Sequence, residues 1–553
     1  MHNYWRNYKW LWGLIPILFL FGAIFYPLIN LLLTAFGGNN SEIFGLTNRW
    51  FDLVDFYYFK RIIITIFQAA TASFICLLLG IPIALAIWLV KTQQLNPNQS
   101  SCEYVLYKIR TKSLNQITKL LLLPFILPVM VVILAIRAIS FELSSEGFIP
   151  LITTYVFYNL GLAVWLIFNA LMRIPVNIIN SAKTLGATNW QILVKVILPM
   201  IKNSINSAFV LVFLFCSSSF GVAFLIGGQK WATLEVEIYL LATQSLNLQA
   251  ASILAILQMT IMLILMVYFS KQQFALPLAF SQNKNIWQLP NWFVNLISII
   301  ILAITLVILS PIITLLIKSF TNSASVFSLL FSNPDFYLAL TNTLLFPTMA
   351  IPIAFVFAWC SAIAVFSTSS SLNFIPRKNT RNSLLFSLLF YSPYMISATV
   401  LALGLLITYP FFGGNLLILI FAYTFLAYPL LARNILLAWQ QHNPLLPLAV
   451  VNLGGNKFQA FYHGVLPQII PQLRTGLAFA TATMIGEFSS TLFLSRPEWL
   501  TLSTFIYQYL GKVGKSNVDQ AQLCAGILIV LTLVVIYLIH GRTIFAKKNP
   551  YAY

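Results

Sequence analysis

The chain has 553 residues, of which 59% are hydrophobic and only 8% are charged. Soluble globular domains carry roughly a quarter charged residues, so this composition excludes a soluble enzyme, a nucleic-acid-binding protein and a disordered scaffold. The formal net charge of +19 does not indicate nucleic acid here, because basic residues of membrane proteins gather in cytoplasmic loops. The composition predicts an all-α, polytopic membrane protein.

Twelve apolar stretches are long enough to cross a bilayer, whose hydrocarbon core requires about 20 residues of helix. The first one follows Arg6 and Lys9 as a signal peptide would. Its apolar run is long, however, and no small-x-small cleavage site follows Phe36, so we expect a retained helix. We therefore predict about 12 transmembrane helices, near residues 11–34, 62–90, 117–139, 150–172, 205–227, 248–270, 293–318, 337–366, 382–408, 414–438, 475–494 and 521–541.

The charges of the connecting loops predict the orientation of these helices. If the N-terminus lies in the cytoplasm, most of the 31 Lys and Arg residues fall into cytoplasmic segments, whereas of the 12 acidic residues only Glu103 does. This arrangement follows the positive-inside rule, and the opposite orientation violates it. Because an even number of spans returns the chain to its starting side, we expect both termini in the cytoplasm.

Several motifs recur in the second half of the chain at an offset of 268 residues. They are Leu-Gly at 185 and 453, Leu-Pro at 198 and 466, Phe at 220 and 488, and Trp-x-Thr-Leu-x-x-x-Ile-Tyr at 231 and 499. An unbroken offset through these motifs indicates an internal repeat of two parallel six-helix halves, with a site expected between them. We assign 1–271 to the N-terminal half, 272–291 to a cytoplasmic linker and 292–553 to the C-terminal half.

The loop between the fourth and fifth spans is polar yet patterned. Gly186 allows a turn or a close backbone approach, and Trp190, Leu193 and Ile197 recur at the spacing of an amphipathic helix. Such a surface element suits docking into a groove of a cytosolic partner. Two six-helix halves by themselves are equally typical of secondary transporters, so these loops have to distinguish the classes.

The two copies of this loop resemble the Glu-Ala-Ala signature of permease subunits in binding-protein-dependent ABC importers. In that family the loop is a coupling helix, which sits in a cleft of the ATP-binding subunit and transmits its closure to the membrane halves. The resemblance implies a type I importer fold, a homodimeric ATP-binding subunit and a periplasmic substrate-binding protein. It assigns ATPase coupling to Ala182, Leu185, Gly186, Leu198, Pro199, Ala449, Leu453, Gly454, Leu466 and Pro467.

The two copies depart from the signature to different extents. The glutamate of the signature is replaced by Asn180 in the first copy and by Leu448 in the second. The second copy also has Val450 in place of an alanine and Gly464 in place of an aliphatic residue. These departures leave open whether the second loop couples as the first one does.

The chain has no nucleotide-binding motif. Gly514-Lys515-Ser516 comes nearest, but Tyr509 stands where a phosphate loop requires its earlier glycine. We therefore expect a transporter subunit and not an enzyme, without a cofactor or metal of its own. The resemblance implies that ATP and Mg are bound by the separate ATPase.

The segment Ser219–Tyr239, and within it the run from Thr233 to Tyr239, is similar to thiamine permeases, as is Ala250–Gln258. Fused two-half permeases of this family also include iron(III) importers. The resemblance implies import of thiamine or its phosphates, with an iron(III) permease as the alternative and a 12-helix secondary transporter as the less favoured one.

Glu487 is the only acidic residue placed within an expected span. Intramembrane acids usually face the bundle interior or a wet cavity. At helical spacing Thr483, Ser490 and Thr491 would share its face, and its counterpart in the first half is Ser219. We assign these positions to a substrate pathway in which Glu487 favours a cationic substrate such as a thiazolium ring. The alternative is a structural glutamate that hydrogen-bonds a neighbouring helix.

Two outer segments, Trp231–Tyr239 and Trp499–Tyr507, are candidates for contact with the binding protein. Their amphipathic pattern is equally typical of a helix that lies on the membrane surface, and we favour that interpretation.

Overall fold

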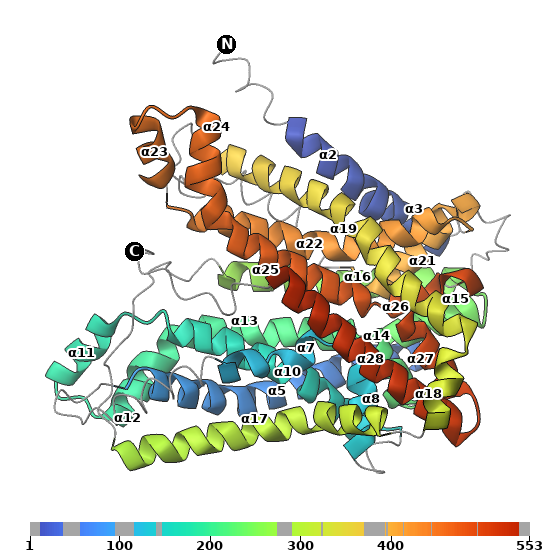
Figure 1. The fold of residues 1–553 in the computed structure, drawn as a ribbon, viewed down its shortest axis with the longest axis horizontal. Coiled ribbons are helices and arrows are strands. Elements are labelled where there is room, and N and C mark those ends of the chain that lie inside the picture. Colours follow the sequence, from blue (N-terminus) through green and yellow to red (C-terminus); the bar gives the residue numbers. More distant parts are fainter. Residues whose placement is uncertain are drawn as a thin grey trace.

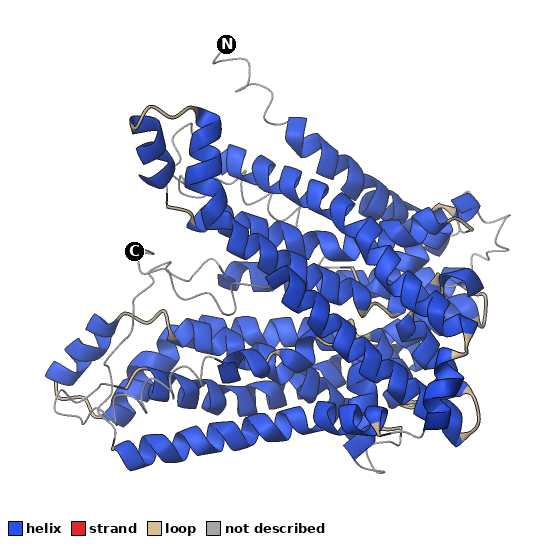
Figure 2. Ribbon diagram, in the orientation of Figure 1, coloured by secondary structure: helices blue, strands red, loops and turns tan. Residues whose placement is uncertain are grey.

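The computed structural model describes residues 11–36, 56–93, 116–139, 146–273, 290–321, 324–369, 393, 396–412, 414–443, 445–494 and 496–540. These residues form helices joined by loops (Figure 2). The helices of the N-terminal half are α2 (Leu11–Leu20), α3 (Tyr26–Ala35), α5 (Phe56–Lys91), α7 (Leu123–Ile126), α8 (Val129–Ile139), α10 (Phe148–Leu171), α11 (Val176–Thr184), α12 (Asn189–Ile192), α13 (Leu198–Ser217), α14 (Phe220–Val222), α15 (Leu234–Thr243) and α16 (Leu248–Gln273).

The C-terminal half has a corresponding set of helices. Its helices are α17 (Asn291–Phe320), α18 (Ala324–Phe331), α19 (Pro334–Ser369), α21 (Ala398–Thr408), α22 (Leu416–Gln441), α23 (Leu445–Asn452), α24 (Lys457–Gln459), α25 (Leu466–Ile485), α26 (Ser489–Phe493), α27 (Leu502–Gly511) and α28 (Lys515–His540). Short π-helical turns η1 (Phe21–Phe25), η3 (Leu193–Ile197), η4 (Ala223–Gly227) and η7 (Ala460–Val465) interrupt or precede the long helices, and η6 (Pro410–Phe412) and η8 (Pro497–Trp499) are 3₁₀ turns.

Within the described residues, nine helices are long and apolar enough to cross a membrane, and a bent pair makes a tenth span if it is counted as one. The expectation of an all-α, multi-span protein is confirmed. The expected number of about twelve spans is corrected to nine or ten for this part of the chain. The expected spans that differ most are 117–139, 382–408 and 475–494.

The expected span 117–139 is a bent pair, Gln116–Ile126 and Val129–Ile139, whose axes differ by 103°. The bend has a local cause, because Pro128 disfavours a helical conformation in the residue before it. Leu127 accordingly has extended backbone angles, with φ −72° and ψ 149°. A straight helix across these residues was therefore the wrong expectation.

The expected span 475–494 is also divided. Its helix begins earlier, at Leu466, and ends at Ile485, before a break that separates α25 from α26. Gly486 lies at this break against the bent pair, since a Cβ there would come within 2.9 Å of the Pro128 Cα. The span expected at 205–227 shows the same displacement, because the helical stretch runs from Asn189 to Ser217. Of 382–408, most of the first half lies outside the described residues, and α21 is short.

The first span of each half lies against the other half. α2 packs on α19, and α3 packs on both α16 and α21. In turn α17 packs on α5 and α8 as well as on α28, and Figure 1 shows it running along α5. The expected linker 272–291 falls mostly outside the described residues, and the two halves that it joins in sequence exchange a helix in space.

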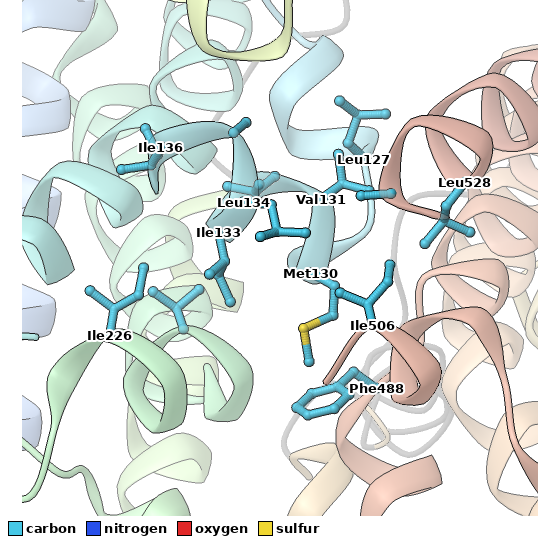
Figure 3. Close-up of a cluster of buried hydrophobic side chains, with 14 of the residues drawn as sticks. Leu127, Met130, Val131, Ile133, Leu134, Ile136, Ile226, Phe488, Ile506 and Leu528 are labelled. Carbon is cyan, nitrogen blue, oxygen red and sulfur yellow. The ribbon is translucent and has the colours of Figure 1, made fainter. Parts of the chain in front are cut away.

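The halves meet at one end of the molecule and separate toward the other. In Figure 1, α14, α15, α26 and α27 lie together at one end, whereas α11 and α12 lie apart from α23 and α24 at the opposite end. The buried core extends across the junction. Met130 and Val131 of α8 point toward Phe488 and Ile506 of the other half in Figure 3, within one continuous hydrophobic cluster.

Candidate functional site

Loop 1 (residues 176–199) is a pair of short helices joined by a tight turn. α11 ends where Gly186 adopts a φ of +80°, a conformation that glycine reaches without steric cost. The Ala187 N–H donates to the Ala182 carbonyl at 3.1 Å, as in a helix C-cap. Thr188 then starts α12 with a capping box, in which its hydroxyl accepts from the Gln191 N–H. The sequence therefore specifies this turn locally.

Loop 2 (residues 445–467) repeats the geometry despite its departures from the signature. Gly454 has a φ of +86°, and the Gly455 N–H donates to the Val450 carbonyl at 2.9 Å. Asn456 and Gln459 exchange side-chain to backbone hydrogen bonds of 2.9 and 2.8 Å, which start α24 as Thr188 starts α12. Replacement of alanine by Val450 does not alter this backbone hydrogen bond, and Gly455 leaves room for the larger side chain, since a Cβ there would come within 2.7 Å of the Val450 Cγ1.

Gly464 also has a structural explanation. A Cβ at this position would come within 2.6 Å of the Pro447 Cα, so glycine lets η7 approach α23 closely. The corresponding residues of loop 1 are Val196 and Ile179, and Ile179 is fully buried. The side-chain volume lost at Gly464 is thus compensated by a closer approach of the η7 and α23 backbones.

Both loops expose the same apolar positions. Leu185 and Leu453 are 88% and 87% exposed, and Trp190 and Phe458 are 71% and 73% exposed. Two further exposed pairs also differ by 268 residues: Ile178 with Leu446, and Val194 with Tyr462. Exposed apolar residues gathered on one element are typical of a protein-interaction surface. The two loops thus share four exposed apolar positions, whereas loop 2 also exposes Leu445, Leu448 and Val451, whose counterparts in loop 1 are polar.

Each loop leads into a long helix through a π-helical turn followed by Leu-Pro. Leu198 and Pro199 begin α13 after η3, and Leu466 and Pro467 begin α25 after η7. A proline here costs little, since the first N–H groups of a helix have no intrahelical partner. All ten residues assigned to coupling thus lie in, or directly at the end of, loops 1 and 2.

Glu487 lies at the break between α25 and α26 and is half-buried. Its Oε1 accepts hydrogen bonds from the Ser490 N–H and hydroxyl, at 2.9 and 3.0 Å. Tyr158 of α10 and Tyr423 of α22 are within electrostatic range of it, so both halves surround this carboxylate. Ser490 is therefore brought to Glu487 as the spacing indicated.

The other two residues of the expected pathway are placed differently. Thr483 is exposed and donates to the Phe479 carbonyl of its own helix, so the break at Gly486 separates it from Glu487. Ser219 occupies the matching break in the first half, between α13 and α14. The two breaks thus carry one carboxylate and one hydroxyl, at equivalent positions.

Sequence reasoning missed two buried acids on α15. Glu237 Oε2 lies 3.3 Å from Arg61 Nε and accepts from the Tyr57 hydroxyl at 3.0 Å. Glu235 is fully buried and accepts hydrogen bonds from the Gln258 amide at 3.2 Å and from the Ser397 hydroxyl at 2.9 Å. Ser397 belongs to the other half, so Glu235 joins the two halves.

α15 is therefore not the surface helix that its amphipathic pattern favoured. Its apolar and acidic residues from Leu234 to Ile238 are all buried, and Trp499 and Leu502 of the second copy are buried as well. The signal that could have indicated burial was the alternation of Glu235 and Glu237 with apolar residues directly after Thr233, together with basic Arg61 in an apolar span.

Comparison with known proteins gives a family and several relatives. Residues 112–275, which include loop 1, match the family described as "Binding-protein-dependent transport system inner membrane component". The chain is 25% identical over 538 residues to the thiamine transport system permease protein ThiP of Haemophilus influenzae, which covers 93% of this chain and 94% of that protein. It is 28% identical over 171 residues to ThiP of Escherichia coli, covering 28% of this chain and 32% of that protein.

A shorter relative aligns with about half of the chain. The sulfate transport system permease protein CysW of Synechococcus elongatus is 24% identical over 265 residues, which cover 45% of this chain and 89% of that protein. A relative that is aligned over most of its own length but over less than half of this chain is what two fused halves predict.

Proposed function

We propose that this chain, an inner-membrane permease subunit of a binding-protein-dependent transport system, carries thiamine or its phosphates from the periplasm to the cytoplasm. The observation that carries the proposal is the alignment with a thiamine permease over 93% of this chain. The alignment supports the substrate, and the internal repeat supports two halves, 1–271 and 292–553.

Transport is driven by a partner. The family is the membrane component of its systems, so ATP hydrolysis belongs to a separate subunit and substrate capture to a binding protein. The residues of loops 1 and 2 assigned above form the contact surface for that ATPase, and Leu185 and Leu453 are the most exposed of them. The two loops share four exposed apolar positions, which supports a homodimeric ATPase with one identical cleft for each loop.

Loops 1 and 2 face the cytoplasm in this proposal, and so do both termini. Basic residues on or next to loop 1, namely Arg173, Lys183 and Lys195, support this orientation through the positive-inside rule. When the ATPase closes, it draws the two loops together. Because α13 and α25 continue directly from the loops to the breaks at Ser219 and Glu487, the movement reaches the junction of the halves.

The charge at that junction supports an organic cation as substrate. Glu487, with Ser490 beside it and Ser219 in the other half, lines the pathway, and Thr483 lies one turn toward the loops. A half-buried carboxylate lowers the free energy of a passing thiazolium ring and raises that of an anion such as sulfate. Iron(III) prefers clusters of hard oxygen ligands, and the described residues contain no group of three His, Cys, Asp or Glu side chains that could hold a metal.

The test is reconstitution of the chain in liposomes with its ATP-binding subunit and binding protein. We expect ATP-dependent uptake of labelled thiamine or thiamine pyrophosphate, and none of labelled sulfate or iron(III). Uptake of sulfate or iron(III) without uptake of thiamine would overturn the substrate assignment. Uptake of thiamine without an ATPase, driven by an ion gradient, would overturn the importer assignment.

A further inference from the structure

Five aromatic rings meet where the two halves join. This ring cluster consists of Phe220, Phe224, Tyr239, Phe488 and Tyr507. Three of its members belong to the N-terminal half and are mutually in contact, with ring centroids 5.0 to 5.4 Å apart. Phe488 and Tyr507 of the C-terminal half are 5.6 Å apart.

Two contacts within the ring cluster cross the junction, and Tyr239 also contacts Phe493 of the C-terminal half, with centroids 5.7 Å apart. Phe220 stacks with Phe488 at 6.0 Å, and Phe224 contacts Tyr507 at 5.8 Å. Phe220 and Phe488 are equivalent positions of the internal repeat, as are Tyr239 and Tyr507. The cluster therefore lies at the pseudo-symmetric centre of the junction, and a route between the two halves passes through it.

The halves are in close contact at the cluster. A Cβ on Gly221 would lie 3.3 Å from Phe488 Cδ1 and 3.0 Å from Val129 Cγ1, so backbone and ring already touch. Phe220 and Phe488 are buried, whereas Tyr239, Tyr507 and Phe224 are only half-buried. The structure thus shows the junction closed at the rings while loops 1 and 2 stand apart (Figure 1).

The polar residues of the pathway are attached directly to these rings. Ser219 precedes Phe220 and Glu487 precedes Phe488 in the chain, at the two helix breaks. The carboxylate and the hydroxyl of the pathway are therefore one residue along the chain from Phe488 and Phe220. Aliphatic side chains would close the junction equally well, but only rings carry the negative face that attracts a cation.

We propose that the ring cluster is a specificity-determining site, which selects flat organic cations by cation–π contact and stacking as the halves part. This inference rests on the proposed function. When the rings separate, Phe220 and Phe488 offer one face from each half to the thiazolium ring, and Tyr239 and Tyr507 border the same space. Glu487 supplies a negative charge, which attracts a cation whatever its shape. The ring faces favour a flat cation over a round one, because a flat cation stacks on them.

The first experiment compares Phe488→Leu and Phe220→Leu with Phe336→Leu in the reconstituted importer. Phe336 is equally buried, and its ring contacts lie within the C-terminal half. We expect thiamine uptake to fall about tenfold in the first two variants, while ATPase activity stimulated by the loaded binding protein persists. Phe336→Leu is expected to transport thiamine normally.

The second measurement separates electrostatics from packing. Phenylalanines with increasing ring fluorination at position 488 weaken the negative ring face and change its shape little. We expect uptake to fall stepwise with each fluorine at position 488 and to stay constant for the same series at position 336. A flat response at 488, or an equal decline at both positions, overturns the inference and leaves the proposed function standing. Absence of thiamine uptake by the unmodified assembly overturns the proposed function, and the inference with it.

Discussion

The two copies of the repeat have diverged to different degrees in their loops and at the junction of the halves. Loops 1 and 2 differ in sequence at Asn180/Leu448, Ala182/Val450 and Val196/Gly464, yet both keep a glycine at positive φ and four matched exposed apolar positions. At the junction of the halves the fold is also repeated, but the charges are not.

At the junction each acid has an uncharged counterpart in the other half. Glu487 corresponds to Ser219, and Glu235 corresponds to Ser503, whose buried hydroxyl has no hydrogen-bond partner within the described part of the chain. A dimeric ATPase with two identical clefts requires similar loops. A small asymmetric substrate does not require identical residues on the two sides of its pathway. Under the proposed function, a shared ATPase explains the similarity of the loops, and the substrate explains the difference at the junction.

The largest effect is expected from a charge in either loop. Leu185→Asp and Leu453→Asp each place a carboxylate where we infer an apolar cleft, and burial of an unpaired charge costs several kcal/mol. We expect thiamine uptake and co-purification of the ATPase to fall by at least about 100-fold in each variant. Val513→Asp, at a fully exposed position between α27 and α28, is the control that should retain the ATPase. If Leu453→Asp left thiamine uptake and co-purification of the ATPase unchanged, only loop 1 would couple, and the two loops would not be equivalent.

Neutralising the junction is expected to be the next largest effect. Glu487→Gln keeps the hydrogen bonds to Ser490 but removes the charge, and a charge-assisted contact is worth roughly 1.5–3 kcal/mol. We expect about a tenfold decrease in thiamine uptake with retained ATPase binding, measured as initial rates over a range of thiamine concentrations. Glu498→Gln, at an exposed site, should behave as the unmodified chain. Full transport with unchanged apparent affinity would make Glu487 a structural residue.

A smaller effect is expected from the turns of the loops. Gly186→Ala and Gly454→Ala force a side chain into a left-handed conformation, which costs about 1–2 kcal/mol, although a Cβ at either site has open space around it. We expect uptake to fall about fivefold in both variants alike. Gly511→Ala also has open space but no positive φ, so it should have no effect. Clearly different losses at the two turns would contradict equal coupling.

The smallest effect is expected at the bond that joins the halves. Ser397→Ala removes the hydroxyl that donates to Glu235 and accepts from the Val400 N–H, a loss of about 1–2 kcal/mol. We expect a lower midpoint of thermal unfolding in detergent. Ser298→Ala, whose hydroxyl bonds only to its own helix, is the control, and an equal shift in both variants would show that the bond between halves adds nothing.

Local patterns were sufficient to predict the loops and most spans. The turn at Gly186, its copy at Gly454 and the Leu-Pro starts at 198 and 466 depend on residues within a few positions of one another, and the structure has each of them. The long apolar runs were equally predictable, since every backbone group in a bilayer has to be satisfied within its own helix. Pro128 is itself a local signal for the bend, and the prediction of a span at 117–139 did not use it.

The amino-acid sequence by itself determined that this is a helical membrane protein with two repeated units and two matched loops, because hydropathy, turn chemistry and an internal offset are all local or periodic properties. Only the tertiary structure decided that the halves exchange their first spans, that α15 is buried with Glu235 against Ser397, and that five rings meet at the junction. These features depend on contacts between residues more than 150 positions apart, whose side chains could have been satisfied equally well by water, lipid or other helices.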